Sequence, residues 1–232
     1  SGGFDLPAVC VVAGIDDDLI ALDHVDALVR KSLLVADRTG AHTRYSMLET
    51  IRQFAEEQLA DSGAAADHRD AHARYFAGRE SDIMATWNGP RQRDAYGWLG
   101  REMPNLRAAF RWAADRGDLD TAATIAVYVS MISLFVEQYE PFGWAAELLP
   151  AARVADHRRL AQLYTMASRT YHIGNYEQAM EYAESGLQVI DSGRYDVVPY
   201  EMDSELPGVY LQTGQIERCN ALHRKRIEQS QD

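Results

Sequence analysis

The sequence predicts a mainly α-helical protein with one β-hairpin. Apolar residues recur at helical spacing over most of the 232 residues, and β-prone runs occur only near residues 33–48. Glycines that can end helices, such as Gly117 and Gly174, separate the helical segments. The composition of 47% apolar and 25% charged residues is that of an ordinary folded chain, which excludes a disordered or fibrous protein.

Residues 1–62 are predicted to form the domain that contains the hairpin. The Asp16-Asp17-Asp18 run, followed by apolar residues at helical spacing, predicts a helix from Asp18 to Lys31. Two β-prone runs then flank a turn at Gly40, and another helix ends at Ser62-Gly63. The order helix, helix, two-stranded wing, helix is typical of a winged-helix domain whose first helix lies upstream or is missing.

Only helices are predicted beyond the hairpin. One helix is marked by His72, Tyr75, Phe76 and Ile83, and another contains Leu106 and ends at Gly117. Further helices are predicted at residues 119–138, 142–155, 158–173, 176–190, 200–213 and 215–229. Residues 63–104 are interpreted as connecting helices, and 105–232 as helical hairpins that resemble an α-solenoid.

Residues 174–182, GNYEQAMEY, resemble the turn and second helix of a tetratricopeptide repeat. In that repeat a glycine ends the first helix, and a small alanine, here Ala179, lets two helices approach closely. Weaker resemblances to the same repeat begin at Gly117 and Gly214. In the second of these, Cys219 occupies the position of the small alanine. The resemblance implies a degenerate array of tetratricopeptide-like hairpins over residues 105–232.

Three stretches near the N-terminus carry a second resemblance: SGGFDL at 1–6, LVRKSLL at 28–34 and RYSMLETIRQFA at 44–55. They look like the winged-helix region of bacterial signal-transduction ATPases of the STAND, or NB-ARC-related, class. These ATPases occur in LuxR-type and SARP-type transcription regulators. PNLRAAFRW at 104–112 is similar to the segment that opens the helical sensor region of the same proteins.

The resemblance implies a switch protein that extends beyond this fragment. A nucleotide-binding domain with ATP or ADP would precede the chain, the winged helix would clamp the ADP state, and the repeats would sense a protein partner. Oligomers are possible in the full-length protein. Related plant and apoptotic proteins have a Met-His-Asp hinge whose histidine contacts phosphate, whereas this chain has Met47-Leu48-Glu49. Leu48 cannot donate a hydrogen bond, so no phosphate contact is expected there.

No catalytic residue, cofactor site or metal site is predicted within these 232 residues. The chain has no phosphate-binding Gly-x-x-x-x-Gly-Lys-Ser/Thr motif, and Cys10 and Cys219 are isolated. His68 and His72 have the i, i+4 spacing of metal ligands but lack the glutamate of a zincin motif. We therefore expect His72 to pack beside its aromatic neighbours and His68 to be solvated.

Charge disfavours nucleic acid as a partner. The chain carries 23 basic and 35 acidic residues, a net charge of −12, with −4 in residues 1–116 and −8 in 117–232. Arg38, His42 and Arg44 on the wing are candidates for DNA phosphate contacts, but no basic recognition helix accompanies them. The apolar run 122–136 is interpreted as a buried helix too short to cross a membrane, and a cytoplasmic location fits best.

A protein-binding groove is predicted on the helix at 158–173. In the repeat geometry one face of that helix lines the concave side, and it carries Tyr164, Ser168, Tyr171 and His172. Exposed aromatic residues on a curved helical face suit a protein or peptide ligand. The sequence therefore predicts a non-catalytic regulatory module that mediates protein–protein interaction and autoinhibition. The alternative is a winged-helix DNA-binding module of a transcription regulator.

Overall fold

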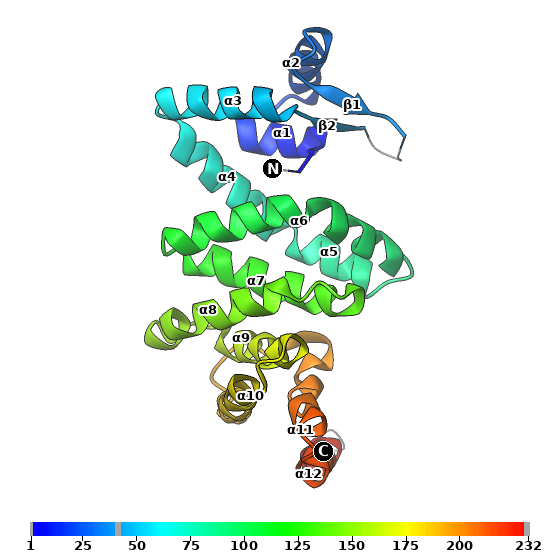
Figure 1. Ribbon diagram of the computed structural model, residues 1–232, viewed down its shortest axis with the longest axis vertical. Helices are drawn as coiled ribbons and strands as arrows, with labels where there is room; N and C mark the ends of the chain where they lie inside the picture. The colour runs from blue at the N-terminus through cyan, green and yellow to red at the C-terminus, as the bar shows by residue number, and fades with distance from the viewer. Residues whose placement is uncertain (1, 40–42, 230–232) are drawn as a thin grey trace. The chain divides into compact units, whose positions relative to one another are not determined.

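The computed structural model describes residues 2–39 and 43–229, and the chain divides into two compact units, Ser1–Thr121 and Ala122–Asp232. The predicted fold class is confirmed, because each unit is mainly helical and the strands among the described residues form a single hairpin (Figure 1). The predicted turn at Gly40 and the wing residue His42 lie outside the described residues.

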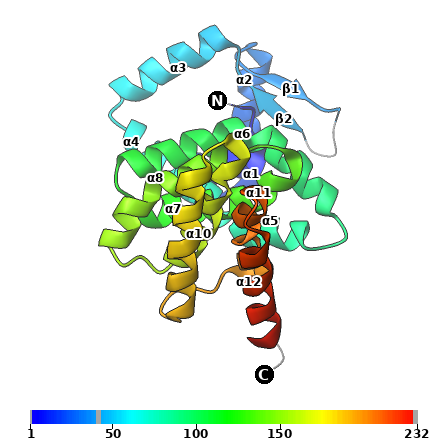
Figure 2. The same ribbon diagram turned by 60° about the horizontal axis from the view of Figure 1, so that its bottom comes forward.

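The first unit contains α1 (Leu6–Ala13), α2 (Asp18–Arg30), β1 (Val35–Asp37), β2 (Arg44–Ser46), α3 (Glu49–Asp61), α4 (Ala65–Gly78), α5 (Glu80–Trp87) and α6 (Gln92–Asp115). α7 (Leu119–Ser133) crosses the division. The second unit continues with the short 3-10 helix η1 (Leu134–Val136), α8 (Glu140–Val154), α9 (Leu160–Ala167), η2 (Ser168–Ile173), α10 (Tyr176–Asp191), η3 (Pro199–Glu205), α11 (Gly208–Gln212) and α12 (Ile216–Gln229), which leads to the C-terminus (Figure 2).

The winged-helix part of the first unit is built around Val25, Leu34 and Tyr45, which are all buried. β1 and β2 pair antiparallel, with Ala36 opposite Tyr45. The backbone of Phe4 joins them, because its N–H and C=O each form a 2.8 Å hydrogen bond with Tyr45. The N-terminal segment is therefore attached to the wing by a single antiparallel bridge at Phe4.

The ends of α2 follow from its sequence. The Asp17 side chain accepts hydrogen bonds from the N–H groups of Leu19 and Ile20, so the aspartate run caps the first turn as predicted. The helix ends at Arg30, one residue before the predicted end. α3 begins at Glu49, whose negative charge in the first turn suits a helix N-terminus.

Two helices of the first unit differ from the prediction. The apolar pattern from His72 to Ile83 predicts one helix, but the structure has α4 and α5, which meet at Arg79 directly after Gly78. Glycine is a weak helix former, which favours a break at this point. α6 runs through Pro104 for 24 residues, so the boundary predicted between residues 104 and 105 falls inside this helix.

The apolar helix α7 is buried, as the sequence predicts. Its surrounding segment Leu119–Val136 is nevertheless long and apolar enough to cross a membrane by length and composition, so the prediction that it is too short is wrong on that criterion. Within the structure 72% of this segment is buried, which explains its apolar character without a bilayer.

The second unit contains a helical hairpin, formed by α9 with η2 and by α10, at the position where the sequence resembles a tetratricopeptide repeat. Gly174 ends η2 in the left-handed conformation, with φ of 90°, which only glycine adopts readily. Gly117 and Gly214 also have positive φ, so the three glycines that mark the degenerate repeats have one backbone role. Ala179 is fully buried on α10 and lies in one apolar cluster with Cys219.

We expect Ala179→Leu to destabilise the second unit by about 1–3 kcal/mol, because the larger side chain overpacks this cluster. The melting temperature of the chain measures the effect. Gln178→Leu is the matched control, because Gln178 is exposed on the same helix and the same residue type is introduced there. Equal melting temperatures for the two variants would contradict the close helix crossing at Ala179.

Candidate functional site: the winged helix and its anchor

A buried polar cluster ties the winged helix to α6. Glu102 and Asn105 lie one turn apart on α6, and both are buried. Arg44 of β2 donates one hydrogen bond to Glu102 Oε1 at 2.5 Å and another to the Gly3 carbonyl oxygen at 2.7 Å. Asn105 Nδ2 donates to Glu102 Oε2 at 2.7 Å, and Asn105 Oδ1 accepts from the Gly2 N–H at 3.0 Å. We call these five residues the anchor.

The anchor needs glycine at position 3. A Cβ atom there would lie 2.8 Å from the Tyr45 carbonyl oxygen, closer than real Cβ contacts. Any side chain would therefore push the N-terminal segment away from β2, where Phe4 and Tyr45 pair. Asn105 also holds this segment by donating to the Gly3 carbonyl oxygen at 3.0 Å.

The outer surface of α2 is acidic and apolar. The segment carries five aspartates, at positions 16, 17, 18, 23 and 26. Its lysine and arginine residues are only two, Arg30 and Lys31 at the end of the helix. Four of the five aspartates are exposed, and the fifth is partly buried. Leu19 and Ile20 lie among them at the first turn, 72% and 50% exposed. This surface repels phosphate groups and offers apolar contacts.

The three wing residues predicted as phosphate contacts differ in their surroundings. Arg44 belongs to the anchor, and its guanidinium forms hydrogen bonds with Glu102 and with the Gly3 carbonyl oxygen. Arg38 is exposed and follows β1, and His42 lies outside the described residues. The wing therefore presents one described arginine to a ligand, beside Asp37.

His68 and His72 both lie on α4, but they have different surroundings. His68 Nδ1 donates to the carbonyl oxygen of Val12 at 2.9 Å, so the prediction that His68 is solvated is wrong. The His72 ring packs against Phe76 at 4.9 Å between centroids, as predicted. Burial lowers the pKa of His72 to about 4, so its imidazole is neutral near pH 7. Among the described residues no group of three metal-ligating side chains occurs.

The four residues of the predicted groove do not form an open surface. Tyr164, Ser168 and Tyr171 are buried, and only His172 is exposed, with its ring stacked on Tyr139 at 5.3 Å. Tyr171 points into the apolar cluster around Ala179. Tyr164 borders a hollow of about 200 Å³ between α8 and α10. The expectation of exposed aromatic residues on this helix is therefore wrong.

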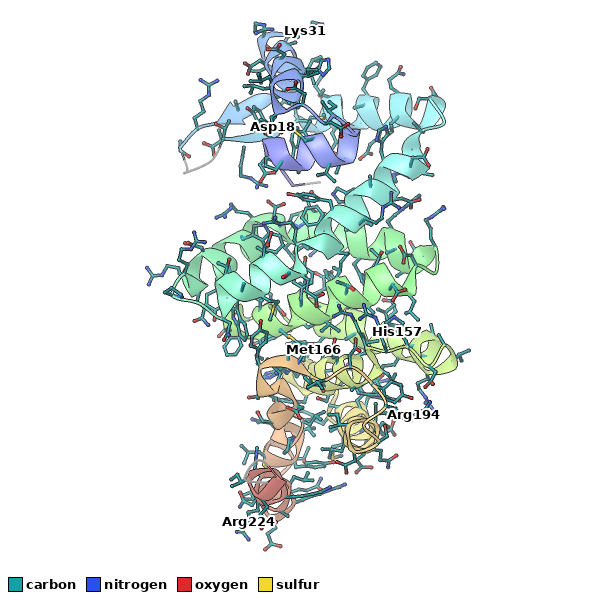
Figure 3. All side chains as sticks on the ribbon, turned by 180° about the vertical axis from the view of Figure 1, so that it is seen from behind. Asp18, Lys31, His157, Met166, Arg194 and Arg224 are labelled. Carbon is teal, nitrogen blue, oxygen red and sulfur yellow. The ribbon has the colours of Figure 1, made fainter. Side chains whose placement is uncertain are left out.

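The chain itself covers the expected groove. Every residue of α9 is buried, because α8 and α10 pack on it and residues 194–206 return across it. The Asp196 N–H donates to the Arg158 carbonyl oxygen at 2.8 Å, and Gln162 Nε2 donates to the Val197 carbonyl oxygen at 2.8 Å. Arg194, labelled in Figure 3, forms an ion pair with Asp156 at 2.5 Å.

A buried arginine lies beside this covered face. Arg169, in η2, is fully buried, and its Nε and Nη1 atoms have no hydrogen-bond partner within the described part of the chain. Its Nη2 atom lies 3.8 Å from Met202 Sδ, and its guanidinium lies 6.0 Å from the centre of the Phe142 ring. Burial lowers the pKa of Arg169 to about 10, which reflects the cost of an uncompensated charge.

The spacing of residues along the chain predicts no role for Glu102, Asn105 or Arg169. One signal was available for the first two: they interrupt the apolar stripe of α6 formed by Leu99, Met103 and Leu106. Polar residues on the buried face of a helix need partners, so such a pair predicts a buried polar cluster. Arg169 comes shortly after the apolar residues of α9 in the sequence. Its distance along the chain from acidic residues indicates no partner for it.

Comparison with known proteins finds similarity over parts of the chain. Residues 1–60 match the family described as "Winged helix-turn-helix domain". Over 130 residues the chain is 43% identical to "Putative HTH-type transcriptional regulator" Rv0890c of Mycobacterium tuberculosis and to Mb0914c of Mycobacterium bovis, which carries the same description. The match covers 54% of this chain and 14% of each relative, so the chain spans a small part of their length.

Proposed function

We propose that this chain is a regulatory, non-catalytic segment of a transcriptional regulator. The winged helix-turn-helix match at residues 1–60 and the description of the relatives support this class of protein. An upstream domain that binds ATP or ADP, a cytoplasmic location and an oligomeric full-length protein are further parts of the proposal.

Direct DNA binding is the role of the winged helix that the comparisons favour. The relatives are described as helix-turn-helix regulators. In such domains the recognition helix enters the major groove and contacts bases through its N-terminal residues. α2 precedes the wing as a recognition helix does, and exposed Arg38 could contact a phosphate.

Protein contact is the role that the residues of α2 favour, and we adopt it. The N-terminal turn of α2, where bases would be read, carries Asp17, Asp18, Leu19 and Ile20. Carboxylates at this position repel DNA phosphates, and exposed leucine and isoleucine suit an apolar protein surface. This acidic and apolar first turn is the observation that carries the proposal. The autoinhibitory role of the segment rests on it.

Titration of DNA duplexes tests the choice between the two roles. We expect the chain to bind a pool of random 30-base-pair duplexes with a Kd above about 10 μM at about 150 mM salt, because specific sites are not read and non-specific contacts are weak. Fluorescence anisotropy of labelled duplexes gives the Kd. The Asp16→Asn and Asp23→Asn double variant should bind more tightly, since it removes two exposed negative charges from this surface.

The opposite result would establish the DNA-binding role. It would consist of submicromolar affinity for duplexes selected from the pool, weakened about tenfold by Arg38→Ala. Arg224→Ala is the matched control, because Arg224 is exposed on α12 in the second unit and is not part of the wing.

A further inference from the structure

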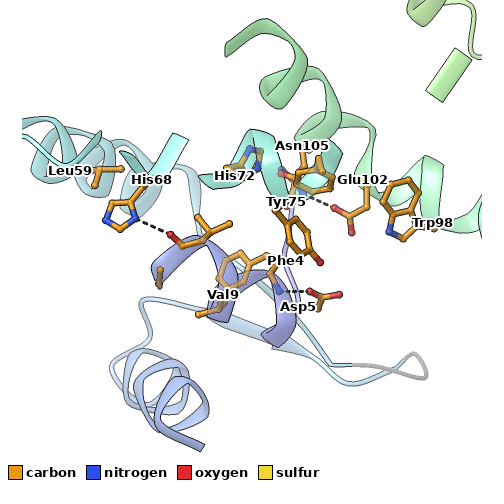
Figure 4. A pocket seen from close by; sticks show the side chains of 15 residues that line it. Phe4, Asp5, Val9, Leu59, His68, His72, Tyr75, Trp98, Glu102 and Asn105 are labelled. Carbon is orange, nitrogen blue, oxygen red and sulfur yellow. Dashed lines mark hydrogen bonds between the residues drawn. The ribbon is translucent and has the colours of Figure 1, made fainter. Parts of the chain in front are cut away.

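The first unit has a cavity of about 360 Å³ between α1, α4 and α6 (Figure 4). Cavities that bind small molecules commonly have volumes from about 300 to 1,000 Å³. Phe4 and Val9 line one side, Tyr75 and Trp98 line another, and Leu59 lies beside His68 (Figure 4). We call this space the α1–α4–α6 cavity.

The walls of this cavity are apolar because α1 faces it. α1 consists of apolar residues and proline, yet none of them is fully buried. Ala8, Val9, Val12 and Ala13 line the cavity, and Val9 also packs against the core of the winged-helix part. A molecule that fills the cavity would remove this apolar surface from water, which is the main source of affinity in such sites.

Two polar groups in the cavity lack partners. The Tyr75 hydroxyl and the His72 imidazole make no hydrogen bond within the described part of the chain, and both line the cavity. Burial, with the nearby Asp5 carboxylate as a further cause, raises the pKa of Tyr75 to about 12, so both groups are uncharged near pH 7. They can therefore exchange hydrogen bonds with a ligand without a change of charge.

The charges around the cavity select against anions. Of the charged residues that act on Tyr75, the carboxylates of Asp5 and Glu102 line the cavity, whereas Arg79 and Arg44 do not. Arg44 pairs with Glu102 and also binds the Gly3 carbonyl oxygen, so the anchor holds this guanidinium. Arg44 itself is not among the lining residues.

We propose that the α1–α4–α6 cavity binds a small uncharged organic molecule with an aromatic or aliphatic body and one hydrogen-bonding group directed at Tyr75 or His72. The body would lie against α1 and the aromatic rings of α4 and α6. Because α1 belongs to the winged helix and α4 and α6 do not, the bound molecule would join the two parts. Its role as a regulatory signal rests on the proposed function, whereas binding itself does not.

The fluorescent probe N-phenyl-1-naphthylamine tests this proposal, because it is uncharged, aromatic and carries one N–H group. We expect saturable binding at one site per chain with a Kd on the order of 10 μM, read from the rise of its fluorescence. 1-Anilinonaphthalene-8-sulfonate has the same ring systems and adds an anion. It should bind at least about tenfold more weakly because of Asp5 and Glu102.

Variants locate the probe. Ala8→Phe fills the cavity and should weaken binding at least about tenfold, whereas Val11→Phe should leave it unchanged. Val11 is the matched control, because it is 54% exposed on the same helix and does not line the cavity. Tyr75→Phe removes only the hydroxyl and should weaken binding about three- to tenfold. If Ala8→Phe fails to fold, the affinity of Tyr75→Phe for the probe shows whether the probe binds in this cavity.

Three results would overturn the proposal. The first is fluorescence that rises without saturation, and the second is equal binding by the wild type, Ala8→Phe and Tyr75→Phe. The third is probe binding to this chain that is lost in the longer protein, because an apolar side chain of a neighbouring segment then fills the cavity. Binding of the probe would stand even if the chain were found to bind DNA, so the two proposals fail separately.

Discussion

Glu102→Leu is expected to destabilise the first unit by about 3 kcal/mol. The change removes the carboxylate that accepts hydrogen bonds from Arg44 and Asn105. Breaking a buried ion pair from one side costs about 3–5 kcal/mol. We take the lower part of this range because the Arg44 side chain is 22% exposed and keeps some contact with water.

Amide hydrogen exchange measures this effect locally. The N–H groups of Phe4 and Tyr45 are hydrogen bonded to each other's carbonyl groups, and Glu102→Leu should speed their exchange by about 100-fold. Glu57→Leu, at an exposed position of α3, is the control and should change little. The double variant Arg44→Met and Glu102→Leu should recover part of the loss, because no unpaired charge remains. Unchanged exchange in Glu102→Leu would show that the anchor does not hold the N-terminal segment.

Arg169→Met is expected to stabilise the second unit by about 1–3 kcal/mol. Arg169 is fully buried, and two of its guanidinium nitrogens have no partner among the described residues. Methionine fills a similar space without a charge, and replacing buried charged groups by apolar ones often stabilises a protein by about 1–4 kcal/mol. Urea unfolding gives the change in the free energy of unfolding.

Two further variants test why the free energy of unfolding should increase in Arg169→Met. Arg224→Met makes the same chemical change at an exposed position and should alter stability by less than about 0.5 kcal/mol. The Glu205 carboxylate raises the pKa of Arg169 against the effect of burial, so Glu205→Gln tests whether the two groups pair in solution. Destabilisation by both Arg169→Met and Glu205→Gln would mean that the buried arginine is compensated, and would contradict the expected gain.

Local signals in the sequence were sufficient to predict most helices. The aspartate run fixes the start of α2 because it caps the first turn, and Gly174 fixes the end of η2 because it adopts positive φ. The break between α4 and α5 was missed because the apolar spacing continues across Arg79 while the backbone does not. The boundary predicted between residues 104 and 105 falls inside α6, because packing of this helix outweighs the single hydrogen bond that Pro104 cannot make.

The candidate site was less predictable because its contacts join distant residues. Arg44 and Glu102 are 58 positions apart, and Gly2 and Asn105 are 103 apart. The prediction of an exposed groove was wrong for a related reason. The repeat pattern describes α9 and α10 but contains no information on the return segment at residues 194–206, which covers the face with Tyr171. Periodicity predicts elements, whereas these partners depend on tertiary contacts.

The close approach at Gly3 makes one position diagnostic in the comparison of sequences. A Cβ atom at this position would collide with the backbone of Tyr45, and no change of rotamer can relieve a contact with backbone. A related chain with any other residue at this position must therefore route its N-terminal segment differently. Its equivalents of Arg44, Glu102 and Asn105 would then be released from their present constraint and free to diverge. The residue type at the position of Gly3 thus distinguishes chains that keep this attachment of the wing from those that have lost it.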